Sequence, residues 1–253
     1  MSGPFPWIEE IQQGYRKTLT FPEIRKGVVA LSRLYVKERG RMARGEVFEG
    51  RAKRAAFACF YSPLHFLLVR EIVSALLAHL RAPKRILDLG CGLGVAGLAW
   101  AGLCDPTPEL VGYEKNPWAA EEGRWLLASL VRRSRIHRKP LESAFPARKG
   151  DAIVAAFIVN ELEEATRGKL LDHLMAAAER GCPILVIEPI SRRVAPWWRE
   201  WSEGFRAMAG RDDDWSFPVS LPDPLAELDR AAGLDHRELK ARSLFFAGEK
   251  ALV

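Results

Sequence analysis

The chain has little cysteine: four residues in 253, at positions 59, 91, 104 and 182. No two of them have the CxxC spacing or another spacing typical of zinc ligands, and their number is small for a disulfide framework. This scarcity favours reduced, unpaired thiols in a cytoplasmic protein, and we expect no metal site.

The sequence also lacks a long uncharged apolar run and the basic-then-apolar order of a secretory signal. Its most apolar stretch, residues 63–80, contains Arg70 and Glu71 near its middle. A bilayer core would strongly penalise those charges, so we expect no membrane partner. Hydrophobic residues make up 48% of the chain and charged residues 28%, which is typical of an ordinary globular protein with a full core.

Basic residues are plentiful and unevenly distributed. The formal net charge is +6, and residues 33–55 contain eight Lys and Arg against three Asp and Glu. A second basic cluster lies within residues 131–140 and consists of Arg132, Arg133, Arg135, Arg138 and Lys139. Two such clusters favour a polyanionic partner such as RNA, although each alone is equally typical of a solvated surface.

Strand-like and helix-like segments alternate from residue 83 onward. Short runs rich in Val and Ile predict five buried strands, at 84–90, 109–114, 134–139, 151–159 and 183–189. Helix-like segments separate these runs, and a last extended stretch covers 236–253. The alternation predicts an α/β fold with a doubly wound, mainly parallel sheet.

A helical, basic segment precedes the predicted sheet. Apolar residues recur at helical spacing over 21–40, namely Ile24, Val28, Leu31 and Tyr35. Ser62 and Pro63 are typical of an N-cap followed by proline in the first turn, and they predict a second helix that ends near residue 81. We expect residues 1–82 to be a separate domain from 83–253.

The strongest local signal is RILDLGCGLGVAGLAW, residues 85–100, in which a strand passes through a glycine-rich turn into a helix. The dinucleotide fingerprint G-x-G-x-x-G is absent, because Val95 stands where its third glycine belongs. No Gly-Lys-Ser/Thr follows, so a phosphate-binding P-loop is absent as well. The pattern present is Asp-x-Gly-x-Gly-x-Gly, from Asp88 to Gly94.

From residue 83 to its end the chain resembles the class I S-adenosylmethionine-dependent methyltransferases, whose first motif has this form. The resemblance implies a seven-stranded, Rossmann-like methyltransferase domain over 83–253 with S-adenosylmethionine as cofactor. An insertion is expected around residues 190–217.

The chemistry of S-adenosylmethionine suits the residues of this motif. The ligand carries a sulfonium cation and an amino-acid tail, so the acidic Asp88 fits at the strand end, acting through the turn backbone or a water. Gly90, Cys91 and Gly92 form the turn, where the glycines let the main chain approach the ligand closely. Glu114 ends the next strand, 20 residues after Gly94, and is expected to accept both ribose hydroxyls.

The ends of the third and fourth strands supply the remaining candidates. The resemblance places Leu141 and Glu142 near the adenine ring. Phe157, Asn160 and Glu161 are expected to face the methyl group, where Asn160 would orient a nucleophile and Glu161 would accept a proton. Asn160 and Glu161 equally suit a helix N-cap followed by an acidic first turn.

Residues 30–40, 55–76, 214–217 and 236–253, in this order, are similar to the methyltransferase-like family of mitochondrial small-ribosomal-subunit proteins and its bacterial relatives. This resemblance implies a role at small-subunit ribosomal RNA, as an enzyme or as an assembly factor. Members often hold an iron–sulfur cluster, with one cysteine beside the motif that reads here Trp215-Ser216-Phe217. Because Ser216 stands in that place, we expect no cluster.

Tryptophan recurs within the expected insertion, at positions 197, 198, 201 and 215. The aromatic faces would suit unstacked RNA bases. Alternatively the residues belong to a helix whose tryptophans cap the core, which their partly helical spacing favours.

The leading function is therefore a methyltransferase that acts on RNA, with small-subunit ribosomal RNA favoured. One alternative is a small-molecule methyltransferase in which the N-terminal helices close as a lid. Another is a ribosome-assembly protein that keeps the methyltransferase fold without catalysis.

Overall fold

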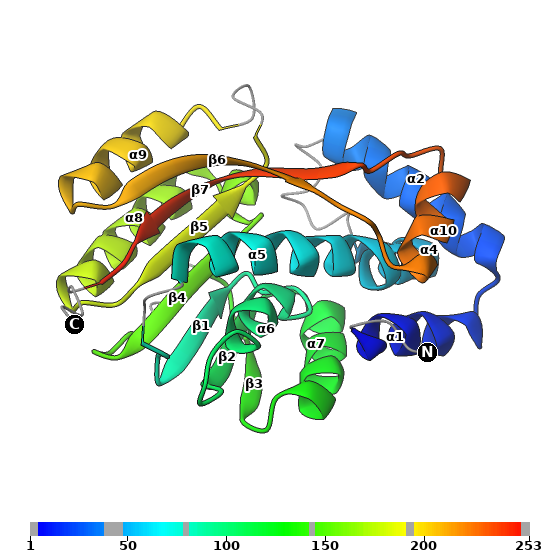
Figure 1. Ribbon diagram of the computed structural model, residues 1–253, viewed down its shortest axis with the longest axis horizontal. Helices are drawn as coiled ribbons and strands as arrows, with labels where there is room; N and C mark the ends of the chain where they lie inside the picture. The colour runs from blue at the N-terminus through cyan, green and yellow to red at the C-terminus, as the bar shows by residue number, and fades with distance from the viewer. Residues whose placement is uncertain (1–4, 38–47, 78–80, 142–144, 191–194, 249–253) are drawn as a thin grey trace. The chain divides into compact units, whose positions relative to one another are not determined.

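The computed structural model describes residues 5–37, 48–77, 81–141, 145–190 and 195–248 (Figure 1). The chain divides into two units. The first consists of Met1–His65 and Phe217–Leu239, and the second of Phe66–Ser216 and Lys240–Val253. The second unit contains the glycine-rich motif.

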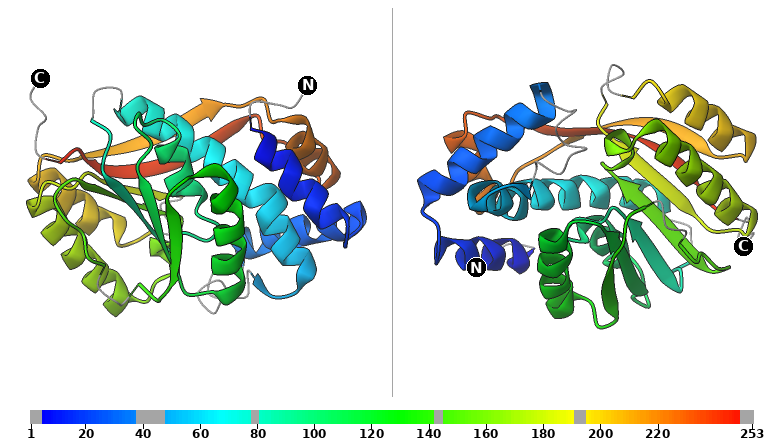
Figure 2. Two further views of the ribbon diagram at one scale, coloured as in Figure 1. Left: turned by 90° about the horizontal axis from the view of Figure 1, so that it is seen from below. Right: turned by 180° about the vertical axis from the view of Figure 1, so that it is seen from behind.

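A seven-stranded sheet is the framework of the second unit. Its strands are β1 (Arg85–Leu89), β2 (Glu109–Glu114), β3 (Ser134–Arg138), β4 (Asp151–Ala156), β5 (Ile184–Glu188), β6 (Arg211–Pro218) and β7 (Glu238–Phe246). They are ordered β3-β2-β1-β4-β5-β7-β6, and β1 to β5 lie side by side in both views of Figure 2. The pairs among β1 to β5 are parallel, whereas β5 and β7 are antiparallel. The doubly wound, mainly parallel, seven-stranded sheet predicted from the sequence is confirmed.

Helices cover both faces of this sheet. They are α6 (Val95–Ala101), α7 (Pro117–Leu130), α8 (Glu164–Glu179) and α9 (Trp198–Ala207). Helix α6 contacts β1, β2 and β4, and α7 contacts β2 and β3. Helices α8 and α9 lie on the opposite face (Figure 1). Leu87, Ile153, Val186 and Leu244 belong there to one buried cluster. Because β1 to β5 are parallel, their carboxyl ends lie along one edge of the sheet.

Residues 190–217, which the sequence analysis treats as an insertion, carry α9 and β6, and β6 is an edge strand of the sheet. Trp197, Trp198 and Trp201 are buried against the core together with Phe205. The expectation that these tryptophans cap the core is confirmed, so these three are not exposed platforms for bases.

The first unit is helical. It contains α1 (Pro6–Arg16), α2 (Phe21–Lys37), α4 (Arg51–Ala56), the π-helical turn η2 (Phe57–Tyr61), the start of α5 (Ser62–Leu77) and α10 (Asp223–Ala231). Ile24, Val28 and Leu31 are buried, as the predicted amphipathic helix requires. Residues 38–47 of the basic segment 33–55 lie outside the described residues.

The prediction that Ser62 is a helix N-cap is wrong. Helix α4, η2 and α5 are continuous, and Ser62 has helical backbone angles. Its N–H donates to the carbonyl of Phe57, five residues earlier, which is the hydrogen bond of a π-turn. Ser-Pro is locally typical of a helix start, but here the packing of the helix carries it through the proline.

Pro63 has a consequence for the turn before it. Proline has no N–H, so the carbonyl of Cys59, four residues earlier, lacks its usual α-helical donor. The buried side chain of Gln12 on α1 donates from Nε2 to that carbonyl at 3.1 Å and to the carbonyl of Pro224 on α10 at 3.1 Å. One amide thus ties three helical segments of the first unit together.

One helical stretch, Arg51–Leu76, is long and apolar enough to cross a membrane by length and composition. Of its most apolar window, 67% is buried inside the protein, and the core helix of a globular protein passes the same test. The expectation of no membrane partner stays a prediction.

We expect Gln12→Met to lower the free energy of unfolding by about 1–3 kcal/mol, because two carbonyls, one buried and one partly buried, lose a donor. The measurement is urea denaturation at neutral pH. Gln13 is the control: it is the next residue on the same helix but is exposed, and Gln13→Met should change stability by less than about 0.5 kcal/mol. Equal effects of the two substitutions would show that the buried amide does not hold the helices.

Candidate functional site

The turn between β1 and α6 is built on glycine. Gly90, Gly92 and Gly94 have φ angles of +64°, +52° and +80°, a left-handed region that L side chains rarely adopt. A Cβ at Gly90 would lie 2.3 Å from Cγ1 of Ile158, the second residue after β4. The turn is therefore pressed against the segment that follows β4, and only glycine fits at position 90.

Asp88 at the end of β1 is almost completely buried. Its Oδ2 accepts a hydrogen bond of 2.8 Å from the N–H of Gly97 in the first turn of α6. Burial raises the pKa of Asp88 to about 7, the Gly97 hydrogen bond opposes that rise, and the negative charge of Glu114 adds to it. Asp88 thus fixes α6 against the strand, and its predicted contact with a cofactor stays a prediction.

Glu114 joins the end of β2 to the glycine turn. Its Oε2 accepts from the N–H of Gly92 at 3.0 Å and its Oε1 from the N–H of Asn116 at 2.7 Å. Burial raises the pKa of Glu114, and the same two N–H groups oppose the rise. Each carboxylate oxygen keeps a second lone pair, so this group can still accept a pair of hydroxyls.

The segment after β4 has an unusual backbone. Phe157 has φ +61°, a conformation that costs a non-glycine residue about 1–3 kcal/mol. Its N–H donates to the carbonyl of Ile187 at 2.8 Å, which holds the bend against β5. A 3-10 turn, Val159–Glu161, follows directly. Strain of this kind concentrates at functional sites, where the surrounding structure maintains it.

Glu188, at the end of β5, organises this segment. It is 1% exposed, and its Oε1 accepts from the N–H groups of Val159 at 2.7 Å and Asn160 at 3.2 Å. Its Oε2 accepts from Nδ2 of Asn160 at 2.6 Å, and Oδ1 of Asn160 accepts from Nε1 of Trp197 at 2.9 Å. The amide of Asn160 is therefore fixed in one orientation.

Asn160 is not the N-cap of the next helix. Helix α8 begins at Glu164 with Glu163 as its N-cap residue, and the Asn160 side chain is bound to Glu188 and Trp197 instead. The helix-cap interpretation of Asn160 is wrong for that reason.

Glu161 is half-buried beside two other carboxylates. Burial raises its pKa to about 8, and the negative charges of Glu188 and Glu114 add to the rise, whereas Lys115 opposes it. A carboxyl group with a pKa near neutrality can release or accept a proton at physiological pH. Glu114, Glu161 and Glu188 thus form an acidic cluster at the ends of β2, β4 and β5.

The other predicted residues are placed as follows. Leu141 is buried in the core beyond β3, while Glu142 lies outside the described residues. Cys91 is buried, and its Sγ lies 2.6 Å from the position that a Cβ at Gly112 would take. Burial raises the pKa of the Cys91 thiol well above its usual range, so it is a packing residue of the turn rather than a nucleophile.

Glu188 and the role of Trp197 were not predicted from the sequence. Glu188 ends a buried strand in PILVIEP, the same position that drew attention to Asp88 and Glu114, so its signal was available. Trp197 had no such signal, because its indole reaches Asn160 only through the fold.

Among the described residues, no three His, Cys, Asp or Glu side chains are grouped so that they could hold a metal ion. All four cysteines are free thiols. The expectations of no metal site and no iron–sulfur cluster stay predictions.

No protein-family model and no curated protein matches the chain. Its fold is similar to the N-methyltransferase NodS from Bradyrhizobium japonicum, solved with S-adenosyl-L-homocysteine. The TM-score is 0.54 at 14% identity, over 83% of this chain and 98% of that chain. It is also similar to the magnesium protoporphyrin IX methyltransferase of Synechocystis with bound S-adenosylmethionine. There the TM-score is 0.48 at 13% identity, over 86% and 95% of the two chains.

The likeness to NodS shows that the chain has the Rossmann-like fold of class I S-adenosylmethionine-dependent methyltransferases. Neither likeness supports the finer resemblance to the mitochondrial small-subunit family.

The raised pKa of Asp88 predicts a pH dependence of stability. Between pH 4 and 7 the unfolded chain has lost this proton and the folded chain keeps it, so the stability that Asp88 contributes falls as pH rises. We expect Asp88→Asn to remove up to about 1.4 kcal/mol of this fall per pH unit. Denaturation at several pH values measures it. The control Asp172→Asn changes an exposed residue on α8 and should leave the pH dependence as it is, and a pH-independent effect of Asp88→Asn would contradict the assignment.

Proposed function

We propose that this protein is an S-adenosylmethionine-dependent methyltransferase. The observation that carries the proposal is the link between Glu114 and Gly92, which joins a strand-end carboxylate to a left-handed glycine turn. The fold agrees with this function, because solved neighbours of the same architecture are methyltransferases.

The residues of the turn fit this cofactor. The glycines at 90 and 92 leave the backbone open to a close ligand, Glu114 offers acceptors to ribose hydroxyls, and the acidic cluster suits a cationic sulfonium. When bound, S-adenosylmethionine supplies an electrophilic methyl group. The expected adenine contacts of Leu141 and Glu142 remain part of the proposal.

The segment after β4 would act on the methyl acceptor. The Asn160 amide, held by Glu188 and Trp197, would orient the acceptor, and Phe157 would border the methyl group. Glu161 would take the proton that a protonated acceptor must lose, which its pKa of about 8 permits near neutral pH. These roles need no covalent intermediate with the protein.

We further propose that the acceptor is RNA, with small-subunit ribosomal RNA the favoured substrate. Arg132, Arg133, Arg138 and Lys139 around β3 are exposed, and within the described part of the chain none of them is paired with a carboxylate. Trp125 on the neighbouring α7 is 60% exposed. Exposed cations around β3 and an exposed aromatic side chain on the helix that packs against it suit phosphates and unstacked bases.

Tritium transfer from labelled S-adenosylmethionine tests the acceptor. The protein is offered, in parallel, RNA from a strain that lacks the gene, ribosomal subunits from that strain, and a small-metabolite extract. We expect label in small-subunit RNA, and Glu161→Gln should lower the rate by about 10²–10⁴-fold if Glu161 transfers a proton. Glu163→Gln, an exposed glutamate two residues on, is the control and should keep the wild-type rate.

The other outcomes each contradict part of the proposal. Label in the extract alone would overturn the RNA assignment in favour of a small-molecule methyltransferase. Binding of S-adenosylmethionine without transfer to any acceptor would favour a non-catalytic assembly protein. A wild-type rate for Glu161→Gln would remove Glu161 from the reaction.

Cofactor binding gives an independent prediction. Glu114→Gln should lower the affinity for S-adenosylmethionine by about 10–100-fold, because the charged acceptor for the ribose hydroxyls is lost. Isothermal titration calorimetry measures it. Glu109→Gln, at the opposite end of the same strand, changes a residue paired with Arg135 and should bind as the wild type does. Unchanged affinity of Glu114→Gln would place the cofactor elsewhere.

A further inference from the structure

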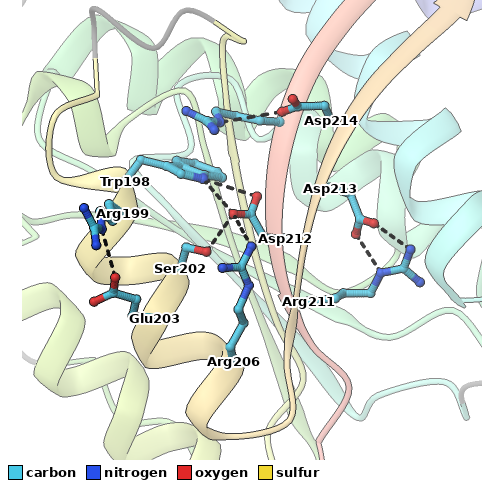
Figure 3. Close-up of polar contacts among 10 residues, drawn as sticks. Trp198, Arg199, Ser202, Glu203, Arg206, Arg211, Asp212, Asp213 and Asp214 are labelled. Carbon is cyan, nitrogen blue, oxygen red and sulfur yellow. Dashed lines mark hydrogen bonds and ion pairs between the residues drawn. The ribbon is translucent and has the colours of Figure 1, made fainter.

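A groove of about 580 Å³ lies between α9 and the strands β6 and β7. It is separate from the glycine turn, and none of the residues proposed for the cofactor lines it. Its polar lining includes Arg199, Ser202, Arg206, Asp212 and Arg242, together with the ring of Trp198. Figure 3 shows Ser202 and Arg206 on α9 pointing toward Asp212 on β6.

Arg242 is the unusual member of this lining. It is 8% exposed, and its Nε is buried without a hydrogen-bond partner in the part of the chain that the structure describes. Nε forms a long ion pair with Oδ1 of Asp214 at 3.8 Å, too far for a hydrogen bond, and the Asp214 side chain is 53% exposed. A buried guanidinium in this condition is costly to maintain.

The contact with Trp198 does not satisfy Arg242. The guanidinium carbon lies 4.1 Å from the centre of the Trp198 ring, a cation–π contact that uses the face of the group. The N–H donors lie in the guanidinium plane and stay available at its edge. Stacking therefore fixes the orientation of the fork and leaves the hydrogen bond of Nε unmade.

The acidic side chains of the groove are already engaged. Asp212 accepts from Oγ of Ser202 at 2.6 Å, from Nε1 of Trp198 at 3.2 Å and from Arg206 at 3.4 Å (Figure 3). Glu203 pairs with Arg199 at 3.0 Å. These two groove carboxylates therefore face other cations, and within the described residues the only ion pair of Arg242 is the long one to the exposed Asp214.

The position of Arg242 connects the groove with the candidate acceptor site. In the antiparallel pair of β5 and β7, Arg242 lies directly opposite Glu188. Glu188 holds the side chain of Asn160, the residue proposed to orient the acceptor. Side chains at paired positions point to the same face of a sheet, so the groove begins beside that site.

We propose that this groove is an oxyanion-binding site that holds a phosphate or carboxylate group of the methyl acceptor, with Arg242 as its anchor. The part concerning the acceptor rests on the proposed function. A planar guanidinium fork binds such groups through two parallel hydrogen bonds, and the groove volume lies within the range of sites for compounds of nucleotide size. Arg206, at the rim, adds a second cation.

Inorganic phosphate, titrated into protein without S-adenosylmethionine, tests the site. The readout is the ¹⁵N-detected Nε–H resonance of arginine side chains, with the Arg242 signal identified by its absence from Arg242→Lys. We expect saturable movement of that resonance, and phosphate affinity about tenfold weaker in Arg242→Lys, because lysine lacks the planar fork. Arg206→Gln changes an exposed side chain and should also lower the affinity for phosphate. This variant tests the site if Arg242→Lys does not fold.

Arg211→Gln is the matched control. Arg211 lies on β6 next to Asp212 in sequence, but it donates two hydrogen bonds of 2.6 Å to Asp213 (Figure 3). This substitution should leave phosphate binding unchanged. The proposed oxyanion site is overturned if the Arg242 resonance does not respond to phosphate. It is also overturned if Arg211→Gln lowers phosphate affinity as much as Arg206→Gln does.

Competition with bound phosphate identifies the source of the oxyanion. It also distinguishes failure of the oxyanion site from failure of the proposed function. A short RNA oligonucleotide that displaces phosphate supports an RNA acceptor, whereas adenosine monophosphate that displaces it when the oligonucleotide does not supports the site and overturns the RNA acceptor. With the labelled acceptor, Arg242→Lys should raise KM about tenfold and change kcat by less than about twofold. An unchanged KM would show that the groove does not bind the methyl acceptor. If the wild type transfers no methyl group at all, only the proposed function is overturned.

Discussion

The buried carboxylate of Glu188 holds the candidate site in its arrangement. It binds two backbone N–H groups and the amide of Asn160, and so fixes the turn that follows β4. That turn also includes the left-handed Phe157 and the side chain of Ile158, which packs on Gly90. Without an acceptor at this strand end, the bend would have neither its hydrogen bonds nor a defined contact with the glycine turn.

Glu114 and Glu188 end two parallel strands, and Glu161 lies in the turn that follows a third. Burial raises the pKa of Glu161, and the negative charges of Glu188 and Glu114 add to that rise. Burial also raises the pKa of Glu114, where the N–H groups of Asn116 and Gly92 oppose the rise. A cationic ligand at this edge would relieve the repulsion, which is a physical reason for an electron-poor sulfonium to suit the site.

Much of the fold was predictable because its signals are local. Short apolar runs predict the strands, and the glycines predict the turn because only glycine easily adopts its left-handed φ angles. Glu114 is predicted from its place at a strand end. The start of α5 was not predictable from Ser62, because packing carries the helix through Pro63. The use of Asn160 depends on Glu188 and Trp197, which are distant in sequence, so no local pattern could show it.

The chain passes between the two units three times, after residues 65, 216 and 239. The helical unit therefore takes α10 from the C-terminal half of the sequence, where it packs with α1 and α2. A fragment that begins at residue 83 would keep α10 but leave the apolar residues Leu225 and Leu228 without those partners. Neither unit corresponds to a single contiguous gene segment, so the pair would be inherited, duplicated or transplanted as a whole.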